Sequence, residues 1–87
     1  MEFEFDPAKS AANKAKHGID FVEAQELWND PERLEIPARS VDESRLQVVG
    51  RIGDTVWSAF VTPRDTRIRI ISVRHARDEE EAAYLEV

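Results

Sequence analysis

The stretch RIRIISVRHA, residues 67–76, constrains the fold more than any other part of the chain. Its isoleucines and valine predict a β-strand, in which successive side chains point to opposite faces. Ile68 and Ile70 would therefore lie on one face, but Ile71 and Val73 would lie on the other. The apolar face changes in the middle of the strand, which predicts either a β-bulge or a strand covered on different faces at its two ends.

The position of the arginines depends on which arrangement the strand adopts. On a regular strand Arg69 and Arg74 would project to opposite sides, and Ile71 and Val73 would need cover from a C-terminal helix or a partner. A bulge near Ile71 or Ser72 would instead bring the two arginines to one face. Only in that case could both contribute to one site.

The N-terminal part of the chain predicts a short strand followed by a helix. Phe3 and Phe5 alternate with glutamates, as in an amphipathic strand. Asp6-Pro7 supplies an N-cap with proline at the first helical position, and Gly18 stands where a C-cap glycine is expected. These signals predict a helix over residues 7–17, with a narrow apolar face for close packing formed by Ala8, Ala11, Ala12 and Ala15.

The rest of the chain predicts a second helix, a sheet and a last helix. Asp20 can cap the second helix, which Asn29-Asp30-Pro31 ends, so the first two helices are expected to form a hairpin. Turn signals and alternating apolar residues then predict strands over 34–36, 46–52, 55–62 and 67–76 and a polar loop over 38–44. A last helix is predicted over 78–87, capped by Asp78, and its candidates for an inward-facing side are Ala82, Leu85 and Tyr84. The predicted fold is α+β, with a helical hairpin packed on an antiparallel sheet and a C-terminal helix.

Length and composition limit the chain to one domain, residues 1–87, with a modest core. The absence of cysteine rules out disulfides and thiolate zinc sites and fits a reducing compartment, so a cytoplasmic location is expected. No apolar run approaches the length of a membrane span, and the acidic N-terminus does not resemble a secretory leader.

Charge is strongly segregated along the chain. The formal net charge is -6, yet the sequence between Arg45 and Arg77 contains seven arginines and only two acids. A basic segment within an acidic protein is expected of a local anion site on a chain that does not bind nucleic acid indiscriminately.

Two sets of side chains could carry chemistry. The first shares one face of the 7–17 helix and comprises Lys9, Asn13, Lys16 and His17. The second comprises Arg64, Arg67, Arg69, Arg74 and Arg77. A solvated helix face and surface ion pairs would explain the same residues without any function. His75 is more simply explained as a surface histidine, since it faces away from Arg74.

Together the two sets suggest cleavage of RNA without a metal. That reaction needs a base for the 2′-hydroxyl, cations for the charge that develops on the phosphate, and an acid for the leaving oxygen. Lysine, arginine and histidine supply all three. The chain has no cysteine nucleophile, and it has no P-loop, dinucleotide fingerprint or HExxH motif.

Several motifs resemble the BrnT family of bacterial toxins, the partners of BrnA antitoxins in type II toxin-antitoxin modules. They are FEFDPAKSAANKAKHGIDFVEA near the start, Asp30-Pro31, and RIRIISVRHA followed by Glu80 and Tyr84. The resemblance implies a RelE-like fold and a ribonuclease that arrests translation. It further implies neutralisation by a BrnA-like antitoxin with a ribbon-helix-helix domain, in a hetero-oligomer that reaches operator DNA only through the antitoxin.

The chemistry of the matched residues suggests their roles. We assign proton transfer to His17, and the phosphate to Lys9, Arg64, Arg69 and Arg74. Substrate contacts are expected from Asn13, Lys16, Arg67 and Ser72, with no metal and no cofactor. The sequence departs from the family in its last helix, where acidic residues replace common arginines at Asp78, Glu79 and Glu81.

Two other functions are compatible with these residues. The chain could be a catalytically inactive RelE-like binding module that acts only in complex with its antitoxin, which the acidic last helix favours. It could also be a small structural protein whose arginines form surface ion pairs. Growth arrest that depends on His17 and Arg69 would separate the toxin from both alternatives.

Overall fold

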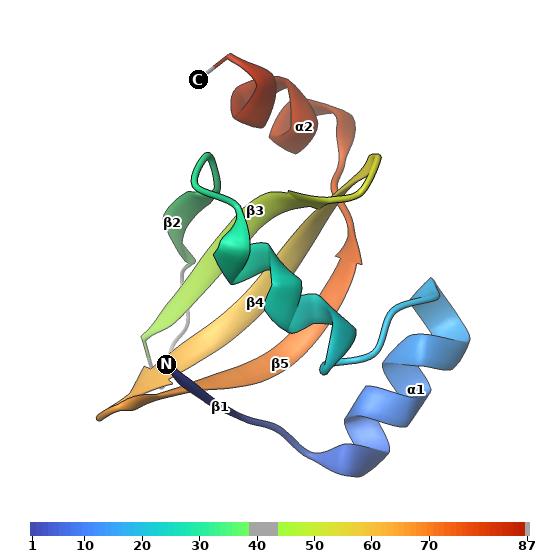
Figure 1. Cartoon of the computed structure of the whole chain (residues 1–87), viewed down its shortest axis with the longest axis vertical. Coiled ribbons are helices and arrows are strands. Elements are labelled where there is room, and N and C mark those ends of the chain that lie inside the picture. Colours follow the sequence, from blue (N-terminus) through green and yellow to red (C-terminus); the bar gives the residue numbers. More distant parts are fainter. Residues whose placement is uncertain (39–43, 87) are drawn as a thin grey trace.

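A five-stranded mixed sheet organises the computed structural model, which describes residues 1–38 and 44–86 (Figure 1). The strand order is β1-β5-β4-β3-β2, with β1 parallel to β5 and the other pairs antiparallel. In chain order the elements are β1 (Glu2–Glu4), α1 (Pro7–His17), the 3-10 helix η1 (Glu23–Asn29), β2 (Leu34–Ala38), β3 (Arg45–Ile52), β4 (Thr55–Arg64), β5 (Arg67–His75) and α2 (Asp78–Leu85).

A β-bulge, one of the two arrangements that the sequence left open, is present in β5. Phe60 of β4 lies opposite Ser72, and the next residue, Val61, lies opposite Ile70, so Ile71 is the extra residue. Because the extra residue reverses the alternation, Val73 packs in the same core as Ile70. The expectation that Val73 would need cover from the other side is therefore wrong.

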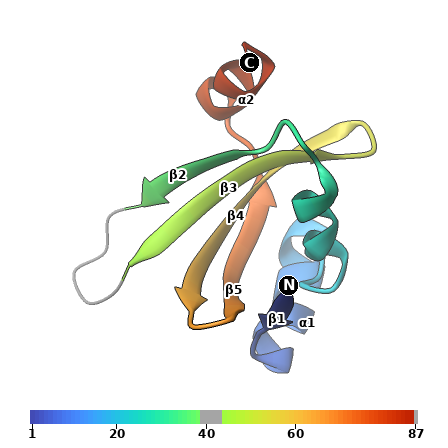
Figure 2. The same ribbon diagram turned by 60° about the vertical axis from the view of Figure 1, so that its left-hand side comes forward.

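Helices cover the two faces of the sheet unequally. Helices α1 and η1 lie on one face, and α2 lies at one end of the other face (Figure 2). The main core fills the space beneath α1 and η1, with Phe21, Leu27, Val48, Val61 and Ile70 almost fully buried. A smaller cluster beneath α2 contains Val49, Val56 and Tyr84. We call the face that bears α2 the open face, because α2 covers only one end of it (Figure 2).

The α+β class is confirmed, but the N-terminal helical hairpin and the RelE-like arrangement are not. Helix α1 packs on β5, whereas η1 packs on β3 and is a 3-10 helix. The residue that caps η1 is Val22 rather than the predicted Asp20, whose Oδ1 instead accepts hydrogen bonds from the N–H groups of Val22 (2.9 Å) and Glu23 (2.7 Å) in the turn that leads into the helix. The alanine face of α1 is exposed; the helix instead buries Ser10 and Asn13, which bond to neighbouring backbone.

The sheet also differs from the expected antiparallel sheet at both edges. At one edge, the N-terminal strand β1 pairs in parallel with β5. This pairing joins residues far apart in the sequence, so local sequence patterns do not predict it. At the other edge β2 continues through Pro37, because a proline without an N–H is tolerated in an edge strand. The predicted loop over 38–44 falls largely outside the described residues.

The last helix differs in its cap and in its buried face. Its N-cap is Arg77 rather than Asp78, and Glu80 reaches back to accept a hydrogen bond from the Arg77 N–H at 2.9 Å. Ala82 and Leu85 are exposed, contrary to expectation, and Tyr84 alone is buried among the described residues of the helix. The predicted final residue of the helix, Val87, lies outside the described residues. Helix α2 therefore docks through few apolar contacts.

Candidate active site

The polar face of α1 and the bulge of β5 line an open, shallow pocket of about 270 Å³. Helix α1 is set in place by its ends: the Ala8 N–H donates to Asp6 Oδ1 at 2.9 Å, and Gly18 ends the helix with a φ of +83°. The spacing along the helix then brings the predicted side chains together. The pocket is lined by Lys9, Ala12, Asn13, Lys16, His17, Phe21, Ile71 and Ser72.

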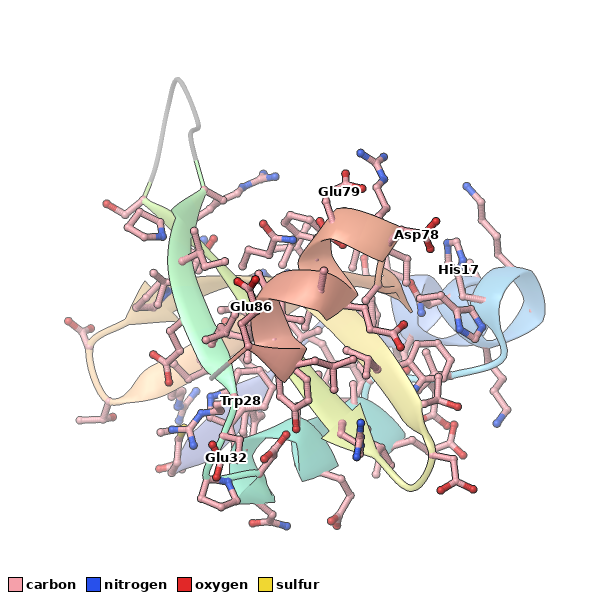
Figure 3. All side chains as sticks on the ribbon, turned by 90° about the horizontal axis from the view of Figure 1, so that it is seen from above. His17, Trp28, Glu32, Asp78, Glu79 and Glu86 are labelled. Carbon is pink, nitrogen blue, oxygen red and sulfur yellow. The ribbon has the colours of Figure 1, made fainter. Side chains whose placement is uncertain are left out.

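The two lysines and the histidine of the pocket are open to solvent to different degrees. Lys9 and Lys16 are exposed, and neither forms an ion pair with a carboxylate of residues 1–38 or 44–86. His17 is half-buried at the C-terminal end of α1, beside the sheet in Figure 3. An imidazole beside two ammonium groups suits binding of an anion and transfer of a proton.

Asn13 lines the same pocket, but its amide is already engaged by the chain. Its Nδ2 donates to the Ile19 carbonyl at 2.8 Å, and its Oδ1 accepts from the Val73 N–H at 3.2 Å. The pairing of β1 with β5 ends at Arg69, so Val73 has no strand partner on that edge. Asn13 therefore holds α1 against the bulged strand and positions the other pocket residues.

The bulge also determines which residues of β5 share the open face. Arg69, Ser72 and Arg74 lie opposite Thr62, Phe60 and Ser58 of β4, which alternate with core residues. A two-residue step along a strand is about 7 Å, so the backbone positions of Arg69 and Arg74 are roughly 13 Å apart, with Ser72 between them. Ser72 belongs both to the open face and to the α1 pocket, and so joins the two predicted sets of residues.

Arg74 is tied into a hydrogen-bonded network with α2. Its Nη1 and Nη2 donate to Glu80 Oε1 (2.8 Å) and Oε2 (2.9 Å), and its guanidinium lies 5.2 Å from the centre of the Phe60 ring. Gln47 Nε2 donates to the same carboxylate at 2.6 Å. The hydrogen bonds from Arg74 lower the pKa of Glu80 to about 2, against the opposing effect of burial, so this carboxylate is ionised at neutral pH. Arg74 thus shares the predicted face, but its charge is neutralised by a neighbour.

Three further arginines predicted for the site lie beyond Ser72, toward the β4–β5 turn. Arg69 Nη1 donates to Glu4 Oε2 at 3.0 Å, and Arg67 Nε lies 3.8 Å from Glu2 Oε1. Arg64 lies opposite Arg67 and lines with it an open hollow of about 670 Å³ at the turn. These arginines do not enter the α1 pocket; they extend its cationic surface along the sheet.

Sequence reasoning missed the carboxylates that accompany the arginines, and it missed Arg45. Glu2 and Glu4 reach Arg67 and Arg69 only because β1 pairs in parallel with β5, which the sequence does not signal. Arg45 begins β3 on the face that carries Gln47, a placement that the period-two alternation of the strand could have revealed.

His75 lies apart from the site, as expected. Its ring stacks on Trp57 with 4.2 Å between ring centroids, at the end of β5 near α2. It faces away from Arg74 and Ser72, on the side of the sheet that carries the main core. Replacement of His75 can therefore serve as a control for replacement of His17, because only His17 lines the pocket.

A second polar cluster anchors α2 to the far end of the sheet. The Tyr84 hydroxyl donates to Asp30 Oδ2 at 2.6 Å, and the Arg51 N–H donates to the same oxygen at 2.9 Å. Burial acts to raise the pKa of Asp30, but the hydrogen bonds from Tyr84, Arg51 and Glu32 outweigh it and lower the pKa overall. The same hydrogen bond raises the pKa of Tyr84. Asp30 and Tyr84, two of the residues that carry the family resemblance, are thus direct hydrogen-bond partners in the fold.

In residues 1–38 and 44–86, no group of three or more His, Cys, Asp or Glu side chains is placed to hold a metal ion. Within the same part of the chain, no helix has both the length and the apolar character needed to cross a membrane.

The fold and the site together define a class: a small α+β protein with an imidazole-bearing cationic pocket that opens onto an arginine-bearing sheet face. A family model described as "Ribonuclease toxin, BrnT, of type II toxin-antitoxin system" matches residues 5–80. The chain belongs to the BrnT family, which confirms the resemblance found in its motifs. It is therefore a ribonuclease toxin of the type II toxin-antitoxin class. No curated protein sequence matches the chain significantly.

Proposed function

We propose that this toxin is an endoribonuclease that cleaves RNA without a metal, in the pocket between α1 and the β5 bulge. The observation that carries the proposal is the placement of Ser72 by the bulge. Ser72 lies on the arginine-bearing face and also in the pocket with Lys9, Lys16 and His17. One RNA strand lying over Ser72 would meet both sets of cations.

The pocket side chains can supply each role that the reaction needs. The 2′-oxygen of the substrate forms a bond to phosphorus as its proton passes to the His17 imidazole, and the bond from phosphorus to the 5′-oxygen breaks. The ammonium group of Lys9 or Lys16 stabilises the charge on the phosphate oxygens and can protonate the leaving oxygen. The products are a 2′,3′-cyclic phosphate and a 5′-hydroxyl, with no other reactant consumed.

The arginines of the open face are assigned to binding rather than to proton transfer. Arg69, Arg67 and Arg64 extend from Ser72 toward the β4–β5 turn, where they would contact phosphates next to the scissile one. We retain Arg74 as a weaker candidate, because a phosphate would have to compete with the bidentate Glu80 carboxylate.

Growth arrest tests the proposal in the cell. Expression of the chain is expected to stop growth and translation, and His17→Ala and Arg69→Ala are expected to abolish the arrest while the variants still fold by circular dichroism. His75→Ala removes the other histidine and should remain toxic. Equal toxicity of His17→Ala and the unmodified chain would overturn the assignment of the pocket.

One observation favours a second function, an inactive module that acts only in complex with an antitoxin. Arg67, Arg69 and Arg74 each have a carboxylate within 4 Å, and the first turn of α2 carries four acids. Such a surface could have lost its affinity for RNA. This alternative predicts no growth arrest and no RNA cleavage by a correctly folded protein.

For the partner we propose a BrnA-like ribbon-helix-helix antitoxin that covers the cationic surface in the cytoplasm. The exposed lysines of the pocket favour an acidic segment, and an interface of ordinary size would bury about 1,600 Å². Operator DNA would be bound only through the antitoxin. The test is to co-express the adjacent open reading frame: it should restore growth and co-purify, and failure to do either would count against this partner.

A further inference from the structure

A carboxylate of β1 lies between two arginines of the proposed RNA-binding face. Glu4 Oε2 is 3.0 Å from Arg69 Nη1, and Glu4 Oε1 is 3.9 Å from Arg67 Nη1. Each oxygen of one anionic group thus faces a different guanidinium. Two oxygens of a phosphate would make the same pair of contacts.

The carboxylate is held there by the fold rather than by its own flexibility. Strand β1 pairs in parallel with β5 through Glu2↔Arg67, Phe3↔Ile68 and Glu4↔Arg69. On the opposite side of the strand, Phe3 packs against Trp28 with 4.9 Å between ring centroids, and Phe5 packs against Phe21 at 5.8 Å. These aromatic contacts fix the strand, so the Glu4 side chain stays beside the arginines.

The site remains accessible to a ligand. The side chains of Arg67, Arg69 and Glu4 are 57%, 33% and 28% exposed, and Glu4 and Arg67 line the hollow at the β4–β5 turn. An incoming phosphate therefore needs no opening of the fold. It needs only to displace a carboxylate from guanidinium groups that both anions can use.

We infer that Glu4 occupies the position of an RNA phosphate and competes with it, so that the Arg67–Arg69 pair is a phosphate subsite weakened by the protein itself. The inference rests on the proposed binding of RNA to the open face, and it adds a residue that limits RNA affinity. The ligand is a phosphate of a single-stranded RNA, next to the one that is cleaved. A built-in competitor limits binding of RNA that does not also engage the α1 pocket.

The variant that tests this inference is Glu4→Gln. Glutamine keeps the size of the side chain and one oxygen that can accept from Arg69, but it removes the competing charge. Asp54→Asn is the matched control: it makes the same change of charge in the exposed β3–β4 turn, at the opposite end of the sheet. Both variants should keep the fold of the unmodified chain.

The measurement is fluorescence anisotropy with a labelled 2′-O-methyl RNA oligonucleotide, which cannot be cleaved, in EDTA over a series of salt concentrations. Glu4→Gln should tighten binding about fivefold at low salt, the effect of one unit charge at about 4 Å in water. The logarithm of the binding constant should also fall more steeply with the logarithm of salt, by about 0.7 for one additional phosphate contact. Asp54→Asn should bind as the unmodified chain does.

Binding of inorganic tripolyphosphate, measured by calorimetry, separates this inference from the proposed function. If Glu4→Gln tightens tripolyphosphate binding while no variant binds RNA, the subsite stands and the RNA-binding role fails. If RNA binds but Glu4→Gln binds both anions no better than Asp54→Asn, the inference is overturned and Glu4 only holds the arginines in place. The inference is also overturned if neither anion binds to any of the variants.

Discussion

At the scale of single residues, Asn13 shows how a polar side chain can build a site without acting in it. Its two hydrogen bonds join the loop after α1 to the unpaired edge of β5. Without them Lys16 and His17 would have no fixed position relative to Ser72. The sequence grouped Asn13 with Lys9, Lys16 and His17 and assigned it to substrate contact, because helical periodicity does not reveal which residues of one face also bond to the sheet.

Asn13→Ala should lower the free energy of unfolding by about 1 to 3 kcal/mol, because it leaves the buried Val73 N–H without its partner. Urea denaturation measures the change, and hydrogen exchange should show faster exchange at the Val73 amide. Lys16→Ala is the control on the same helix and should change stability by less than about 0.5 kcal/mol. Unchanged exchange at Val73 in Asn13→Ala would show that the hydrogen bond does not stabilise the strand edge.

Glu80 gives the fold a pH dependence of defined sign. Its pKa is about 2 in the folded protein, lowered from 4.5 chiefly by hydrogen bonds from Arg74. The stability that it contributes is present above pH 4.5 and is lost as the pH falls toward 2. At pH 3 the loss from this one group should be about 2 kcal/mol.

The measurement is the free energy of unfolding in urea at pH 6 and at pH 3. Other carboxylates also become protonated in this range, so Glu80→Gln is needed for comparison. The variant should be less stable at pH 6, and its further loss at pH 3 should be smaller than that of the unmodified chain by about 2 kcal/mol. Equal losses in the two proteins would show that the Arg74–Glu80 pair contributes little to stability.

At the scale of elements, helix α2 depends on specific polar contacts more than on apolar packing. Leu85 is 58% exposed, and the helix contacts the sheet through Tyr84, Glu80 and the small cluster with Val49 and Val56. Removal of one of these polar contacts should therefore produce a measurable change in the surroundings of α2.

Tyr84 is the only tyrosine in the chain, so its ionisation can be followed directly. The hydrogen bond to Asp30 raises its pKa, and burial adds to the effect. Absorbance at alkaline pH should therefore show one tyrosine that titrates above pH 10, and Asp30→Asn should lower that pKa. A tyrosine pKa that does not respond to Asp30→Asn would indicate that the two side chains are apart in solution.

How far the sequence predicts the elements depends on the range of the interactions that form them. The order of apolar residues in β5 predicted a change of apolar face and left two explanations open, and the structure shows that the bulge is the correct one. Asp6 and Gly18 predicted the two ends of α1, because capping depends on residues next to each other in the chain. The parallel pairing of β1 with β5 joins residues more than sixty positions apart, and local patterns do not report on it.

For the candidate site too, local features could be predicted from the sequence and long-range pairings could not. Lys9, Asn13, Lys16 and His17 were grouped correctly because helical spacing is local, and their meeting with Ser72 depends on the bulge. The pairing of Arg67 and Arg69 with acids of β1, and of Arg74 with Glu80, could not be predicted, since an abundance of acids does not reveal which of them lie near the arginines.

At the scale of the whole molecule, a net charge of -6 coexists with a cationic candidate site. The arginines of β5 are accompanied by glutamates of β1 and α2, while Lys9 and Lys16 form no ion pair with the described carboxylates. This arrangement keeps long-range attraction to nucleic acid weak and leaves the charges of the two lysines at the α1 pocket without a described counter-ion. Productive binding would then require that an RNA reach the α1 pocket itself.

The chemistry of the cleaved ends tests the central claim most directly. The purified toxin, its fold verified by circular dichroism, is incubated with RNA in EDTA, and the termini of the products are identified by mass spectrometry. We predict 2′,3′-cyclic phosphate or 3′-phosphate ends with 5′-hydroxyl ends, lost in His17→Ala and retained in His75→Ala. Intact RNA, products with 3′-hydroxyl and 5′-phosphate ends, or full activity of His17→Ala would contradict the account.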